Sequence, residues 1–150
     1  MTRGKLTTPL ILIVLLVLAA CSRPFNVSTA ETKAYMREVL AVDHVESVKV
    51  YFLRPDVYIE VRVSEEIGRQ DIDRVLELTR NYVTTDNMNK VARQVKWSKE
   101  LSSVHLELRS GKERLLKRYV THYFKTYDTT DRSPENLDEY RTWSDVTPDP

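Results

Sequence analysis

Two of the three histidines lie among charged residues whose types and spacing could support chemistry. His105 and Glu107 alternate with apolar residues, so on a strand both would face the polar side of a sheet. If residues 112–127 pair with this strand, Arg118 and His122 would lie close to them. Imidazole and carboxylate groups are common zinc ligands, which makes His105, Glu107 and His122 an alternative metal site. A solvent-facing strand ordinarily carries such residues, and we therefore expect no metal and no other cofactor.

Sequence motifs for common enzymatic reactions are absent. Gly68 and Gly111 are the only glycines after position 20, which excludes a glycine-rich phosphate loop and a dinucleotide-binding fingerprint. The sequence contains no G-x-S-x-G, no H-E-x-x-H and no pair of cysteines. We assign no catalytic residue and favour a non-enzymatic protein, with a hydrolase left as an alternative.

Tyrosines offer a second kind of binding chemistry. Tyr51 and Tyr58 fall on the polar side of two alternating segments, where they could form a platform for carbohydrate or peptide. Aromatic residues at such positions more often shield the surface of the sheet or an overlying segment. The possible binding residues are thus drawn from one predicted surface: Tyr51, Tyr58, His105, Glu107, Arg118 and His122.

Hydrophobic periodicity predicts the elements that must position these residues. Ser28 and Glu31 fit a capping box at the start of a helix that continues to about Val42. Residues 112–127 fit a helical stripe or a strand, and their composition and the preceding Ser110-Gly111 favour the strand. The other predicted elements are a hairpin of residues 48–52 and 57–63, a helix of residues 68–84, an insecure short helix within 86–99, and a strand of residues 104–108.

The order of these elements predicts one α+β domain over residues 28–127. It would contain an antiparallel sheet of about four strands, arranged as two hairpins, with helices on one face. In element order alone, the portion that comprises helix, hairpin, helix and strand loosely resembles the ring-building domains of bacterial secretion and sporulation assemblies, some of which are lipoproteins.

The N-terminus has the layout of an export signal. Of the 62 hydrophobic residues, 13 lie in the first 20 positions, and Leu10 to Ala20 is an unbroken apolar run, too short to cross a bilayer. Leu18-Ala19-Ala20-Cys21 resembles the lipobox of bacterial lipoproteins. The resemblance implies that residues 1–20 are a cleaved signal peptide and that Cys21 carries diacylglycerol and often an N-acyl chain such as palmitate. Residues 21–27 would then be a lipidated tether to a bacterial membrane, with the domain outside the cytoplasm.

Charge is distributed unevenly near the C-terminus. Residues 104–127 have a net charge of +4 and residues 128–150 one of −5. The basic segment could bind an anionic polymer or lipid under control of the acidic tail, or the two could simply pair within the fold, which we favour. We expect residues 128–150 to form an acidic strap or a short turn of helix pinned by Leu137, Tyr140 and Trp143.

These observations predict a small, exported, membrane-anchored lipoprotein that acts as a non-enzymatic interaction module. Its expected partners are the membrane, through the lipid on Cys21, and an envelope protein or polymer, but not nucleic acid. The alternative is a surface-anchored ligand receptor or hydrolase that uses the polar face of the sheet.

Overall fold

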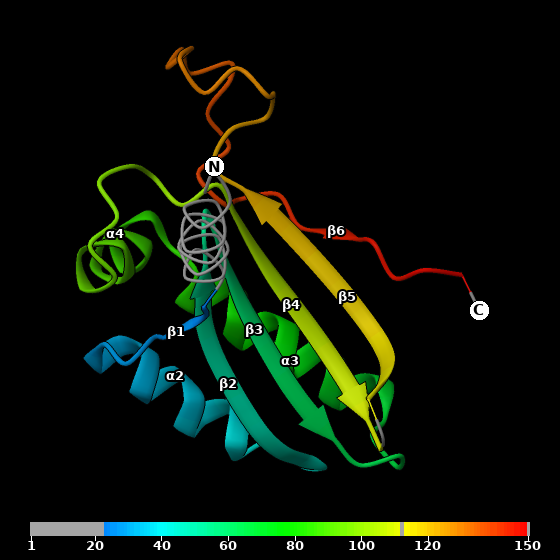
Figure 1. Ribbon diagram of the computed structural model, residues 1–150. Helices are drawn as coiled ribbons and strands as arrows, with labels where there is room; N and C mark the ends of the chain where they lie inside the picture. The colour runs from blue at the N-terminus through cyan, green and yellow to red at the C-terminus, as the bar shows by residue number, and fades with distance from the viewer. Residues whose placement is uncertain (1–22, 112, 150) are drawn as a thin grey trace, which may run out of the picture.

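A mixed six-stranded sheet with helices packed behind it forms the fold (Figure 1). A computed structural model describes residues 23–111 and 113–149. Within those ranges, none of the helices is both long and apolar enough to span a membrane. The elements follow in the order β1 (Phe25–Asn26), α2 (Ala30–Leu40), β2 (Val45–Leu53), β3 (Asp56–Val63), α3 (Arg69–Tyr82), α4 (Thr85–Gln94), β4 (Ser103–Ser110), β5 (Arg114–His122) and β6 (Ser144–Asp145).

The α+β class and both predicted hairpins, β2–β3 and β4–β5, are confirmed. The expectation of a wholly antiparallel sheet is wrong, because β3 and β4 pair in parallel. The cause is the connection between them: α3 and α4 carry the chain back to the end of the sheet where β3 began, so β4 runs in the same direction. The strands also number six rather than about four, since β1 and β6 add two-residue edges.

One face of the sheet forms the hydrophobic core. Alternate residues of β2, β3 and β4 are buried, and α2 and α3 lie behind these strands in Figure 1. Two stacked tyrosines, Tyr35 of α2 and Tyr82 of α3, join the helices with ring centroids 4.4 Å apart. Their hydroxyls hydrogen-bond to Thr79 and Thr32 at 2.8 and 2.7 Å, so this pair is buried with its polar atoms satisfied.

The first helix begins one residue later than the predicted capping box requires. Thr29 is the N-cap, and its hydroxyl accepts the backbone N–H of Thr32 at 3.1 Å. Ser28 and Glu31 instead contact α4: Gln94 bonds to Ser28, and Lys90 pairs with Glu31 at 3.0 Å. The two side chains that the sequence pattern predicts to cap the helix therefore bond to residues of α4 instead.

Both ends of the described chain join the sheet. Phe25 and Asn26 pair with β2, and Val27 is buried, so the predicted tether of residues 21–27 does not extend as far as Val27. At the other end, the predicted anchors of the strap are confirmed, because Tyr140 is buried and Leu137 and Trp143 pack against the core. The strap then pairs with β5 as β6. The predicted strand of residues 112–127 is confirmed as β5 but stops at His122.

Candidate binding face of the sheet

The six predicted binding residues all lie on the face of the sheet opposite the helices. The strand register places Tyr58 between Tyr51 and His105, and it places Glu107 opposite Arg118. This juxtaposition arises because side chains alternate between the two faces along a strand, and residues paired across neighbouring strands project to the same face. Among the described residues, no helix packs over this face.

The aromatic members form a continuous stack across three strands. The rings of Tyr51 and Tyr58 are 5.4 Å apart at an interplanar angle of 9°, and those of Tyr58 and His105 are 4.6 Å apart at 8°. These separations are close to the distance of about 4.8 Å between strands, so the rings stand on the sheet and cover one another's faces. Tyr58 therefore presents its edge and hydroxyl to solvent, and not the free face on which a sugar would stack.

His105 is half-buried in this stack. Burial lowers the pKa of its imidazole, and the nearby Asp56 carboxylate opposes the shift more weakly. The net direction favours the neutral ring, which is the form that stacks on Tyr58 without a desolvation cost for charge.

Glu107 joins two strands through its carboxylate. Its two oxygens contact Arg109 at 2.5 Å and Arg118 at 2.7 Å, and its side chain is only 13% exposed. Because both oxygens are occupied by guanidinium groups, Glu107 does not offer a free ligand to a metal ion. No group of three metal-ligating side chains occurs in the described part of the chain. The contacts of Glu107 thus argue against the alternative metal site with His105 and His122.

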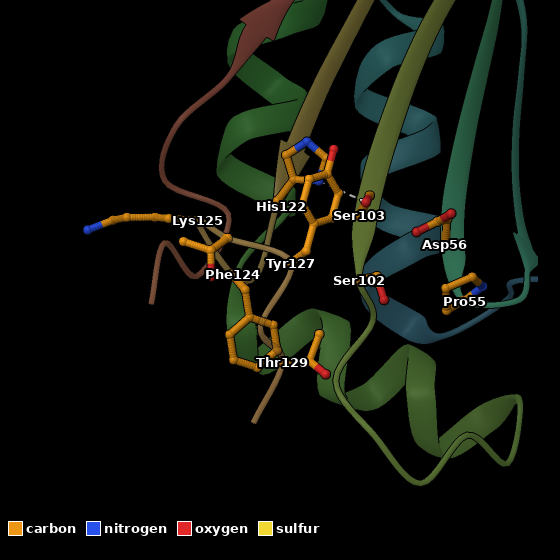
Figure 2. Close-up of a pocket in the computed structure, with 10 residues that line it drawn as sticks. Pro55, Asp56, Ser102, Ser103, His122, Phe124, Lys125, Tyr127 and Thr129 are labelled. Carbon is orange, nitrogen blue, oxygen red and sulfur yellow. Dashed lines mark hydrogen bonds between the residues drawn. The ribbon is translucent and has the colours of Figure 1, made fainter. Parts of the chain in front are cut away.

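An open pocket of about 470 Å³ lies at the end of the sheet where β3 and β4 begin and β5 ends (Figure 2). Ser103 and His122 share a hydrogen bond of 2.9 Å between Oγ and Nδ1. Asp56 lies beside them at the start of β3, and its carboxylate points toward Ser103 in Figure 2. Phe124 and the following loop form the remaining wall. This volume falls in the range of small-molecule sites.

The sequence pattern did not single out Asp56 or Ser103. Asp56 falls between the two predicted strands of residues 48–52 and 57–63, and Ser103 precedes the first apolar residue of β4. A signal was nevertheless present, since the alternation that puts Tyr58 and His105 on the polar face also puts the residues two positions before them there.

The Ser103–His122 pair has only part of a hydrolytic arrangement. In nucleophilic catalysis, the histidine that activates a serine is itself oriented by a third group, commonly a carboxylate. Neither a carboxylate hydrogen bond nor an ion pair of His122 is present among the residues that the structure describes. Within the described residues, the pair thus lacks a third group bonded to the histidine.

The acidic strap pairs with the basic strand instead of covering the polar face. Asp145 bonds to Lys117 at 2.7 Å, and the Arg118 backbone donates to the Thr147 hydroxyl at 2.9 Å. The Lys117 partner holds the pKa of Asp145 down to about 2. Pairing within the fold, the interpretation favoured from the sequence, is confirmed for this part of the strap.

No family model matches the chain, and the curated proteins and the solved structures that were compared with it gave no match.

Proposed function

We propose that this protein is a lipid-anchored interaction module that binds an envelope protein at a membrane surface through the uncovered face of its sheet. The anchor would be the lipid on Cys21, which lies outside the described residues. Support for the anchor comes from the lipobox-like Leu18-Ala19-Ala20-Cys21, and the face supplies the binding surface.

The observation that carries the proposal is the composition of that face. It presents tyrosine edges and hydroxyls beside arginines whose guanidinium groups are already fixed by Glu107. Tyrosine and arginine are enriched at protein interfaces, and prior fixation of their side chains reduces the entropy lost on binding. A stacked, edge-on row also fits a flat protein surface better than it fits a saccharide ring.

A position-specific photocrosslinker tests which surface binds. We would place it at Lys49, an exposed residue of β2 on the polar face, and as a matched control at Asn81, an exposed residue of α3. In intact cells of the native host, we expect a discrete protein adduct from position 49 that Tyr51→Ala weakens, with no such adduct from position 81. Equal adducts from both positions, or none from position 49, would refute the assignment of this face.

The anchor has a separate test. We expect Cys21→Ser to move the protein from the membrane fraction to the aqueous fraction and to abolish the mass increment of the diacylglycerol and acyl chains, because a serine hydroxyl cannot form the thioether. Unchanged membrane retention of the serine variant would refute lipid anchoring through this residue.

A ligand receptor is the second candidate, and the pocket beside Ser103 and His122 is the observation that favours it. The ligand of such a receptor would be a small molecule, whereas the interaction module binds the surface of another protein.

A further inference from the structure

We propose that the pocket at the Asp56 end of the sheet binds the ammonium group of a small primary amine, with the Asp56 carboxylate as its counter-ion. This site lies at one end of the same face, where the strand ends and the loop after Phe124 form a pocket, and it assigns that pocket a small ligand in addition to the proposed protein partner.

Asp56 is distinguished by its lack of partners. Within residues 23–111 and 113–149, its carboxylate makes no hydrogen bond or ion pair, and its Oδ1 atom is buried. The two other carboxylates of this face differ, since Glu60 pairs with Arg62 and Glu107 with two arginines. A partly buried carboxylate without a donor is unfavourable. A cationic ligand would offset its charge, with the contact at Oδ2, because Oδ1 is closed to solvent.

The rest of the pocket fits a cation better than an anion. Ser102 and Ser103 line the same pocket as Asp56, and an ammonium group has three N–H donors for carboxylate and hydroxyl acceptors. Lys125 is the lysine in the pocket lining, but its side chain extends away from Asp56 and the serines in Figure 2. An anion would therefore meet the Asp56 charge without Lys125 to offset it, and a neutral polyol would forgo the ion pair.

The position of the pocket admits two sources of the amine. β1 pairs with the last residues of β2, at the same end of the sheet as Asp56. Three residues separate Cys21 from Phe25, and the four Cα–Cα steps between the two can span at most about 14 Å. If Cys21 carries the lipid, as in the proposed function, the pocket lies near the headgroups. The ammonium group could then belong to an aminolipid headgroup or to a soluble amine.

Calorimetric titration of the full chain in a non-ionic detergent tests the shared chemistry. The probes are ethanolamine, its neutral analogue ethylene glycol and its anionic analogue glycolate. We expect saturable binding of ethanolamine alone, and Asp56→Asn should weaken it about tenfold or more because it removes a charge-assisted contact. Glu60→Gln, the next carboxylate on the same face of β3, is the matched control and should bind as the wild type does.

The comparison of probes keeps the test decisive even if the Asp56 variant fails to fold. Equal binding of ethylene glycol, or no saturable binding of ethanolamine by the wild-type chain, would overturn the proposal. With a folded variant, unchanged affinity after Asp56→Asn would overturn the role of this carboxylate.

Vesicles distinguish the two sources. The Cys21→Ser chain, which lacks the proposed anchor, should bind phosphatidylethanolamine vesicles in an Asp56-dependent manner if a headgroup is the ligand. Phosphatidylcholine has no N–H donor and is the matched vesicle control. Binding of ethanolamine without vesicle binding assigns the pocket to a soluble amine. Failure of lipid anchoring would appear only in membrane fractionation, so it is separable from failure of amine binding.

Discussion

Replacement of Glu107 by glutamine should destabilise the protein more than any other single charge removal on the polar face. The substitution keeps the shape of the side chain but leaves Arg109 and Arg118 without their shared carboxylate. Exposed ion pairs contribute about 0.2–1 kcal/mol each, whereas loss of one partner from a fully buried pair costs about 3–5 kcal/mol. Glu107 is 13% exposed and its two arginines 23% and 34%, so an intermediate loss of about 1–3 kcal/mol is expected.

Urea denaturation at pH 7 measures this loss as a change in the free energy of unfolding, and calorimetry should show a fall in Tm of about 4–12 °C. Glu60→Gln is the matched control. The Glu60 side chain is 20% exposed and pairs with Arg62 at 3.6 Å. Its replacement should therefore lower the free energy of unfolding by less than about 1 kcal/mol. A Glu107→Gln loss no larger than that of the control would refute the interpretation of Glu107 as a structural link between strands.

Three further predictions concern groups whose pKa the fold shifts. Because burial lowers the pKa of His105, the unfolded chain takes up the proton first, so stability should fall as the pH drops below about 6.5; His105→Gln should flatten this slope in thermal melts, and parallel slopes would contradict it. Burial raises the pKa of Tyr82 to about 12, so stability should decline from pH 10 toward 12. Tyr82→Phe should cost about 1–2 kcal/mol in urea at pH 7, and a neutral result would contradict a stabilising hydrogen bond. Lys117 lowers the pKa of Asp145 to about 2. The contribution of this carboxylate to the free energy of unfolding should therefore be present above pH 3.8 and lost toward pH 2. Asp145→Asn should cost no more than about 1 kcal/mol and speed amide exchange at Val146, whereas unchanged exchange would count against the pair as a clamp on β6.

Elements with strong local patterns were predictable from the sequence. Alternation marked both hairpins, and helical periodicity marked α3. The parallel pairing of β3 and β4 was not predictable in the same way, because alternation states which residues share a face but not in which direction a strand runs. The two-residue strands β1 and β6 are too short to show any period.

The candidate site likewise has features that the sequence predicts and features that only the tertiary structure shows. Strand alternation correctly put Tyr51, Tyr58 and His105 on one surface, because that inference needs only the pleat. It could not show that the rings stack edge-out, which depends on the register between strands. Nor could it show that Asp56 borders a pocket, since that pocket also needs the loop after Phe124, which comes from a distant part of the chain.

The incorporation of Phe25 and Asn26 into the sheet, with Val27 buried behind them, also affects how the domain would search for a partner. With an anchor at Cys21, only three residues would separate the lipidated cysteine from an ordered strand, so the domain could sample only a small volume above the bilayer. A short linker raises the effective concentration for sites within its reach and excludes sites beyond it. Binding would then be favoured with partners whose contact surface lies close to the membrane, and insertion of a flexible linker after Cys21 should relax that preference without any change to the binding face.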